Sequence, residues 1–245
     1  MSELSEHKHI VSGFDKDLLE LDSKIARMGG ICEQMLANAL KSMRSRDPEL
    51  GEETILADAE INALEREIED AAIKMIALRQ PMAQDLRQVI GALRIASELE
   101  RIGDLAKNIA RRAVTLSAEK HPKPIRKSLK RMGKMVSSQL NASLDAYARR
   151  NSDLAYDVWQ RDEEVDAMYS SMFRELVTYM MEDPRTISLC AHMLFGARNL
   201  ERIGDHTTNI VEQLYFLVTG DFLSDDRPKG AHTSAMRLDQ DDMDD

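Results

Sequence analysis

The sequence predicts an all-α protein made of two tandem, pseudo-symmetric three-helix bundles. Aromatic residues are only 4% of the 245 residues, methionine occurs 15 times, and glycine and proline are sparse, a composition typical of helical proteins. The hexapeptide Leu-Glu-Arg-Ile-Gly-Asp occurs at 99–104 and again, unchanged, at 200–205, and Asn-Ile follows both copies at the same distance. An internal repeat of this kind indicates a duplicated structural unit.

Prolines divide the chain into long proline-free stretches, as expected where helices end. Pro48, Pro81, Pro122 and Pro184 separate these stretches, and Asn151-Ser152-Asp153 adds a polar break typical of a helix cap. We therefore expect six helices, at about 15–45, 49–79, 82–118, 124–150, 153–182 and 185–219. A helix of this length is a rod of roughly 45 Å, so the bundles should be elongated.

The second expected helix has the clearest periodicity. Its apolar residues recur at steps of three and four, as in a helix packed against long antiparallel neighbours: Ile61, Leu64, Ile68, Ala71, Met75 and Leu78. The repeat also extends into this helix. Asp58, Ile61 and Asn62 correspond to Asp162, Val165 and Asp166, displaced by 104 residues instead of 101, and three extra residues near Pro81 account for the difference.

The repeat predicts where the chain divides. We expect the first three-helix unit at 10–120 and the second at 121–222, with the boundary in Lys120-His121-Pro122-Lys123-Pro124, where proline and charge interrupt the periodicity. Residues 223–245 are polar and acidic and have no periodic apolar face. They are expected to form a disordered tail whose aspartates are solvated.

Charge and cysteine content limit the function. The chain has 43 acidic and 33 basic residues, a net charge of −10, which argues against nucleic acid as a partner and against a general affinity for anionic lipid. Cys32 and Cys190 lie far apart, which excludes a disulfide framework and favours a reducing, cytoplasmic location. The start of the chain lacks a signal peptide pattern, and no apolar stretch is long enough for membrane insertion.

Each copy of the hexapeptide carries two carboxylates four residues apart, Glu100 with Asp104 and Glu201 with Asp205. This spacing places both on one face of a helix, where they repel each other. They continue a stripe that begins with apolar residues, so partial shelter from solvent is expected. Gly103 and Gly204 lie inside the motifs although glycine in a helix costs up to about 1 kcal/mol, which suggests close approach of a backbone or a ligand.

A second set of side-chain oxygens lies on the preceding helix of each half, Asp58 with Asn62 and Asp162 with Asp166. Antiparallel packing could bring both sets together. Clusters of such oxygens suit magnesium, manganese or iron. The alternative is that each acidic pair is a solvated face with Arg101 or Arg202 as surface partner, an arrangement of small energetic value. Duplication of the pair with its glycine and asparagine favours the metal site but is also compatible with conserved packing alone.

Other candidates have weaker patterns. His206 is matched by Leu105 in the first half, so we expect an exposed histidine that is not a ligand; His192 projects away from Glu201 and is expected in packing or at an interface. A helical phosphotransfer protein would use one of these histidines. A di-metal carboxylate oxidase would need a Glu-x-x-His pair on core helices, and only Glu6 and His9 have this spacing.

A direct phosphate sensor would draw on three helix arginines, Arg87, Arg94 and Arg101. No arrangement typical of catalysis was found.

The motifs together resemble one family. Arg79-Gln80-Pro81, then Asp85-Leu86-Arg87, the two hexapeptides with their Asn-Ile pairs, Thr178-Tyr-Met-Met-Glu-Asp183 and Met28-Gly29-Gly30 occur in an order similar to that of the PhoU family of phosphate-uptake regulators. The resemblance runs from about His7 to Gly220. It implies two symmetric three-helix bundles.

The resemblance implies a regulator without enzyme activity that couples the phosphate ABC transporter ATPase to the phosphate-sensing histidine kinase. Such a protein would hold the phosphate-starvation response off when phosphate is plentiful. It also implies homodimers or larger assemblies, and a metal such as iron or zinc bound through Glu/Asp-x-x-x-Asp motifs. The matching positions here are Glu100, Asp104, Glu201 and Asp205, with Asp58, Asn62, Asp162 and Asp166 as counterparts on the preceding helices. Asn62 replaces an acid with an amide and weakens the first set.

Overall fold

The computed structural model describes residues 3–223, with side chains from residue 13 onward. The described chain is all-α, as predicted. Its elements are α1 (Glu3–Ser45), α2 (Pro48–Arg79), α3 (Gln84–Thr115), α4 (Lys123–Arg149), α5 (Ser152–Gln160), α6 (Asp162–Glu182), the single-turn 3₁₀ helix η1 (Pro184–Thr186) and α7 (Ile187–Thr219). The expected acidic tail lies almost wholly outside the described residues.

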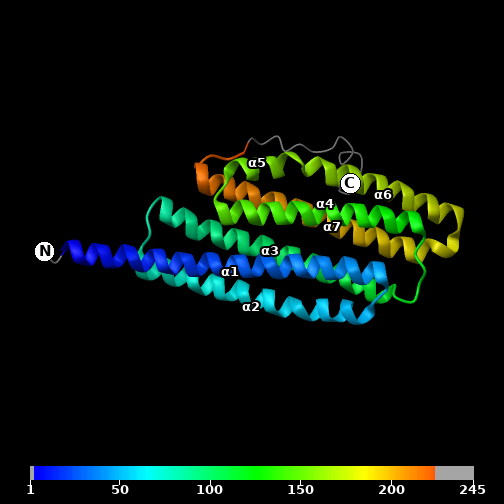
Figure 1. Ribbon diagram of the computed structural model, residues 1–245, viewed down its shortest axis with the longest axis horizontal. Helices are drawn as coiled ribbons and strands as arrows, with labels where there is room; N and C mark the ends of the chain where they lie inside the picture. The colour runs from blue at the N-terminus through cyan, green and yellow to red at the C-terminus, as the bar shows by residue number, and fades with distance from the viewer. Residues whose placement is uncertain (1–2, 224–245) are drawn as a thin grey trace, which may run out of the picture.

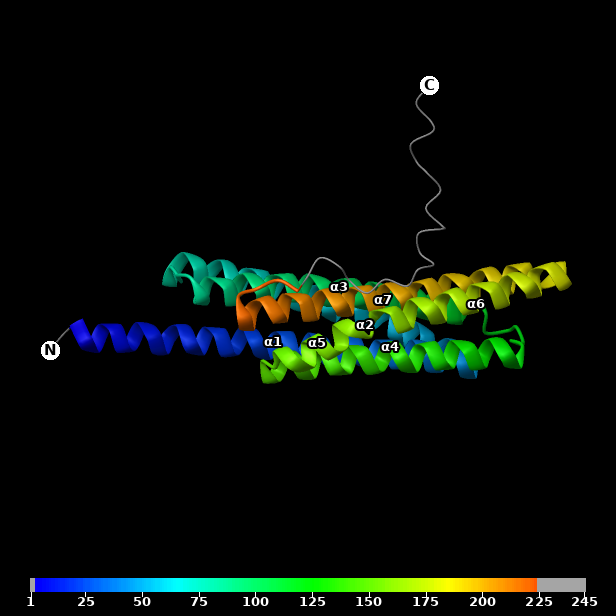
Figure 2. The same ribbon diagram turned by 90° about the horizontal axis from the view of Figure 1, so that it is seen from above.

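The helices form two elongated bundles that lie side by side (Figures 1 and 2). The first contains α1, α2 and α3, and the second contains α4, the α5–α6 pair and α7. The bundles join chiefly where α3 packs along α7, and α1 also contacts α4. The two helices that carry the repeated hexapeptide therefore pack against each other at the centre of the molecule.

Two helices differ from the expectation. The first begins at Glu3 instead of about residue 15. The fifth is interrupted at Arg161, which has φ −92° and ψ 4°. Gln139, buried on α4, donates its side-chain amide to the Arg161 carbonyl at 2.9 Å. This bond stabilises the interruption, and Asp162 consequently begins α6.

Polar residues cap the helices at the predicted breaks. The Asp47 carboxylate accepts a hydrogen bond from the backbone N–H of Leu50 at 3.1 Å, with Pro48 as the first helical residue of α2. The Asn151 side chain likewise accepts from Leu154 N–H at the start of α5. These caps satisfy donors that the helix leaves open. At its other end, α7 stops at Gly220, whose φ of 86° suits glycine.

Apolar residues that recur at helical spacing fill the core. On α3 every member of one stripe is buried: Ile95, Leu99, Ile102, Ala106 and Ile109. Leu78, placed in the seam of α2, is instead 77% exposed. The free Cys32 thiol is buried and donates to the Leu99 carbonyl at 3.2 Å. Across residues 3–223 no helix combines the length and apolar character needed to cross a membrane.

Candidate functional site

Both hexapeptides place their glycine against the preceding helix. A Cβ at Gly103 would lie 2.5 Å from Ile61 Cδ1, and a Cβ at Gly204 would lie 3.4 Å from Val165 Cγ1. Ile61 and Val165 are the residues that the sequence repeat matches to each other. The close approach at Gly103 therefore comes from an aliphatic side chain, not from the backbone or ligand that the sequence suggested, and Gly204 has only an ordinary contact with the equivalent side chain.

In the first half a lysine joins the two sets of acids. Lys107 Nζ donates to Asp58 Oδ2 at 2.7 Å and also to Asp104 Oδ1. Asn62 Nδ2 donates to the same Asp58 oxygen at 3.1 Å. The Lys107 side chain is only 15% exposed. An internal ammonium group thus bridges α2 and α3 and compensates two of the carboxylates.

Glu100 lies beside this bridge, and its negative charge is compensated less well than the charges of Asp58 and Asp104. Its carboxylate is 3.6 Å from Arg101 Nε, which is the surface pair that the alternative interpretation expected. Burial, and then the neighbouring Asp104, raise the pKa of Glu100 above its usual value. Glu65 on α2, which the sequence did not single out, also has a pKa raised by burial and by the charge of Glu100.

The second half holds its acids differently. Thr208 Oγ1 donates to Asp162 Oδ1 at 2.7 Å, and both residues are buried. Glu201 is 4% exposed; its Oε1 accepts from Arg198 Nη1 at 2.5 Å, while its Oε2 has no hydrogen-bond partner. Burial, followed by the charge of Asp205, raises the pKa of Glu201 to about 7. Asp166 adds to this effect.

The two halves therefore differ at one repeated position. A shift of 101 residues matches Lys107 to Thr208. The charged ammonium of Lys107 donates a hydrogen bond to Asp58, whereas the neutral hydroxyl of Thr208 donates one to Asp162. The sequence contained this signal, because the residue three positions after each motif aspartate can be compared directly. A hydroxyl compensates buried carboxylates less than a cation does.

The eight predicted ligands do not form a ready-made metal cluster. Among residues 3–223 no group of three or more histidine, cysteine, aspartate or glutamate side chains is close enough together to hold a metal ion. In the first half Lys107 already bonds to Asp58 and Asp104, so a metal would have to displace it. In the second half Glu201 Oε2 is buried without a partner, so the donors there fit an added cation better.

Both candidate histidines lie where α7 meets α3. His206 Nδ1 is 2.7 Å from Glu98 Oε2, and the His206 side chain is 18% exposed. The expectation of an exposed His206 is therefore corrected, because its neighbour across the bundle interface shelters it. His192 Nδ1 is 3.3 Å from Arg112 Nη1, in agreement with the predicted interfacial position. These contacts leave neither ring as exposed as a phosphotransfer histidine would need to be.

The three candidate phosphate-binding arginines have separate partners. Arg87 lies over the Phe216 ring at 5.1 Å, Arg94 donates to Gln213 at 3.1 Å, and Arg101 pairs with Glu100. Arg87 and Arg94 line one groove with Phe216 and Gln213, but Arg101 is not part of it, so the structure does not favour a phosphate site built from all three.

Comparison with known proteins decides the family. The model of the PhoU domain matches residues 25–113 and 129–214. The chain belongs to the PhoU family. It is 45% identical to the phosphate-specific transport system accessory protein PhoU homolog of Rhizobium meliloti (strain 1021), over 94% of this chain and 97% of that protein. Identity to the homolog of Caulobacter vibrioides (strain NA1000 / CB15N) is 47% over 91% and 96%.

Solved structures of PhoU family members share the fold. The structure from Pseudomonas aeruginosa superposes with a TM-score of 0.83 at 39% identity, covering 85% of this chain and all of that one. The phosphate transport system regulatory protein from Streptococcus pneumoniae superposes with a TM-score of 0.79 at 31% identity, covering 86% and 99%. The chain is thus a phosphate transport accessory or regulatory protein of the PhoU family, not an enzyme.

Proposed function

We propose that this protein acts in the cytoplasm as a negative regulator of the phosphate-starvation response and a modulator of phosphate uptake. It would bind the ATPase of the phosphate ABC transporter and the phosphate-sensing histidine kinase, and so link uptake to signalling. The observation that carries the proposal is the 45% identity over 94% of the chain to a phosphate-specific transport accessory protein. Nucleic acid and direct membrane insertion have no part in this function.

The regulatory role is tested in a bacterium whose own PhoU family gene has been deleted. Such a strain carries a reporter under a phosphate-starvation promoter and is grown with abundant phosphate. Expression of this protein should switch the reporter off, and immunoprecipitation from the same cells should recover the transporter ATPase and the kinase. A reporter that stays on although the protein accumulates and binds both partners would contradict the repressor role.

We further propose that the family metal site is used unequally. Glu201, Asp205, Asp162 and Asp166 would hold a divalent or trivalent metal in the second half, where Glu201 Oε2 is buried without a partner. The equivalent set of Glu100, Asp104, Asp58 and Asn62 would stay without metal because Lys107 bonds two of its members. When bound, the ion would neutralise the carboxylates and fix α6 relative to α7. Iron, zinc, manganese and magnesium are the candidates.

The metal proposal is tested by substitution followed by elemental analysis. Glu201→Gln should remove most of the metal that copurifies with the chain, whereas Glu100→Gln should remove little. Lys107→Thr, which copies the second half, should add metal to the first. Circular dichroism confirms that each variant is folded. Equal loss from Glu100→Gln and Glu201→Gln, or no gain from Lys107→Thr, would contradict unequal use of the two halves.

Self-association is the remaining part of the proposed function. We propose a homodimer or a larger assembly, as the family resemblance implies. Sedimentation equilibrium at several concentrations measures the mass directly, and a mass equal to one chain of 27.7 kDa throughout would contradict it.

A further inference from the structure

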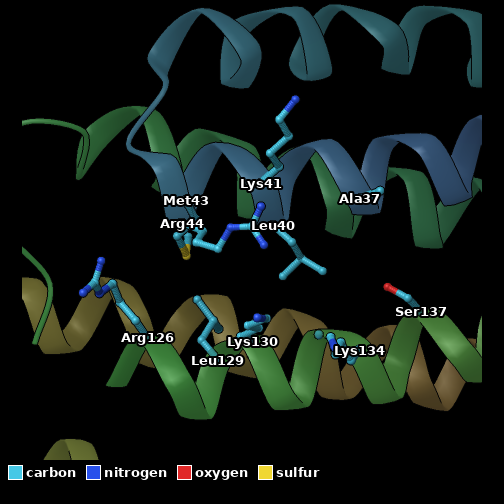
Figure 3. Close-up of a pocket in the computed structure, with 11 residues that line it drawn as sticks. Ala37, Leu40, Lys41, Met43, Arg44, Arg126, Leu129, Lys130, Lys134 and Ser137 are labelled. Carbon is cyan, nitrogen blue, oxygen red and sulfur yellow. The ribbon is translucent and has the colours of Figure 1, made fainter. Parts of the chain in front are cut away.

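A groove with an apolar floor and a basic rim runs between α1 and α4 (Figure 3). Its volume is about 390 Å³. Leu40, Met43 and Leu129 form its floor, and the helices come close beside it, because a Cβ at Gly133 would lie 2.7 Å from Leu40 Cδ1. Five exposed cations line the groove: Lys41 and Arg44 on α1, and Arg126, Lys130 and Lys134 on α4. The Lys41 amine points away from α4 (Figure 3). The groove thus combines apolar and cationic surface.

Within the described part of the chain, the rim cations have no anionic partners. None of the five forms an ion pair with any residue between 13 and 223. Arg126, Lys130 and Lys134 are four residues apart, so they share one face of α4. No acidic residue occurs from Lys120 to Leu144. In a chain of net charge −10, this uncompensated basic surface is suited to an acidic ligand.

We propose that the occupant is the last segment of the same chain, residues 238–245, with the sequence Leu-Asp-Gln-Asp-Asp-Met-Asp-Asp. This segment has five aspartates and no lysine or arginine, a number equal to that of the rim cations. Leu238 and Met243 supply apolar side chains for the floor. The segment therefore complements the groove both in charge and in apolar character. A specific contact needs this combination, because electrostatic attraction alone does not fix how the segment lies.

The length of the intervening chain allows this contact. Residues 224–238 follow the described end at Leu223, and when extended they span about 50 Å. The α7 helix ends at the same end of the molecule as α4 (Figures 1 and 2). Lys130 precedes the end of α4 by 19 residues, or about 29 Å along the axis. The segment can therefore reach the groove with enough slack to pass around the bundle.

Attachment to the same chain makes the contact effective although each ion pair is weak. A connection of this length keeps the segment at an effective concentration of roughly a millimolar. Exposed ion pairs are screened by salt, so occupancy should fall as ionic strength rises. An acidic partner protein that competes for the groove would displace the segment, and binding of that partner would then depend on the segment.

Carbodiimide cross-linking of the full, unmodified chain tests the proposal. The reagent joins a carboxylate to a lysine amine only when the two are in contact, and mass spectrometry identifies the pair. We expect residues 239–245 to be joined to Lys130, Lys134 and Lys41 at yields at least tenfold above those to Lys74. Lys74 is the matched control because it is exposed, lies on α2 and has no ion pair among the described residues.

A variant pair and an isotope mixture complete the test. In the full chain, Lys130→Gln with Lys134→Gln should lower the remaining cross-links to Lys41 at least fivefold, whereas Lys74→Gln should leave them unchanged. In an equal mixture of ¹⁴N- and ¹⁵N-labelled chains, the cross-linked pairs should carry a single isotope. Cross-links to Lys74 as frequent as those to the groove would overturn the proposal.

Two other occupants would give distinct results, and each would overturn the proposal. Pairs with mixed isotopes would assign the groove to a second copy of the chain. Phosphatidylglycerol vesicles that bind the chain and shield the groove lysines from acetylation, in place of any cross-link to residues 239–245, would assign it to an anionic lipid surface.

Discussion

Glu98 on α3 joins His206 on α7 across the interface between the two bundles. His206 Nδ1 lies 2.7 Å from Glu98 Oε2, and Asn209 Nδ2 donates to the same oxygen at 3.0 Å. Asn209 belongs to the second copy of the repeated motif, and Glu98 immediately precedes the first. One half-buried carboxylate therefore connects the two motif copies.

Replacing this carboxylate should loosen the interface. We expect Glu98→Ala to lower the free energy of unfolding by about 1–3 kcal/mol, because two donors lose their acceptor in a sheltered place. Urea denaturation followed by circular dichroism measures the change. Glu52→Ala, at an exposed position of α2, is the control and should shift the midpoint little. Equal effects of the two substitutions would show that the Glu98 contacts contribute nothing.

The two motif glycines should respond differently to alanine. A Cβ at Gly204 meets Val165 at an ordinary distance of 3.4 Å, so Gly204→Ala should stabilise α7 by up to about 1 kcal/mol through helix propensity. A Cβ at Gly103 would lie 2.5 Å from Ile61 Cδ1, so Gly103→Ala should destabilise by about 1–3 kcal/mol through overpacking. Thermal denaturation measures both.

A double variant checks that Ile61 causes this difference. Ile61→Val removes the Cδ1 atom and copies Val165 of the second half. In that background Gly103→Ala should lower the free energy of unfolding by about 1 kcal/mol less than it does alone, which is a typical coupling between residues in contact. Strict additivity of the two changes would place the strain elsewhere.

Glu201 should make stability depend on pH. Its folded pKa of about 7 lies above the ordinary value of 4.5, so the protonated carboxyl favours folding below pH 4.5, and this contribution is lost as the pH rises through 7. Glu201→Gln stays neutral. It should match the native chain near pH 4.5 and be more stable by up to about 3 kcal/mol near pH 8 in metal-free buffer. Urea midpoints across this range test the prediction, with the exposed Glu163→Gln as control; a constant difference would contradict it.

His121 should act in the opposite direction. It is buried in the α3–α4 connection, and burial, with Arg46 and Arg126 nearby, lowers its pKa below 6.5. The neutral ring favours the folded state, so its contribution is present above pH 6.5 and is lost as the pH falls toward the lower folded pKa. His121→Gln, which cannot take up a proton, should therefore gain stability relative to the native chain between about pH 7 and pH 5. Parallel stability curves for the two proteins would contradict this assignment.

Much of the fold could be predicted from local sequence signals. Pro48 and Asn151 mark helix starts that their caps confirm, and the stripe from Ile95 to Ile109 is buried as its spacing predicts. The interruption at Arg161 could not be predicted, because it is stabilised by the distant Gln139 side chain. Leu78 follows the apolar spacing yet is 77% exposed, since spacing indicates a face of the helix but not where its neighbours stop covering it.

The candidate site was predictable as a pattern but not as a set of contacts. The motif repeat pointed to Glu100 and Glu201 as equivalents, yet only the structure places Lys107 between Asp58 and Asp104 and leaves Glu201 Oε2 without a partner. The contact of Lys107 is absent from the shared pattern because the equivalent residue in the second copy is Thr208. Glu98 and His206 come from different repeats and are 108 residues apart, so no periodicity could have paired them.

The Lys107–Thr208 difference also makes the two halves of the molecule inequivalent. Two identical halves would present the same binding surface twice. A partner could then bind such a symmetric molecule in either of two orientations. Because the internal Lys107 ammonium of the first half stands where the second half has the buried Thr208 hydroxyl, the interiors of the two halves are chemically unlike. The pseudo-symmetric repeat therefore does not make the two halves interchangeable for a binding partner.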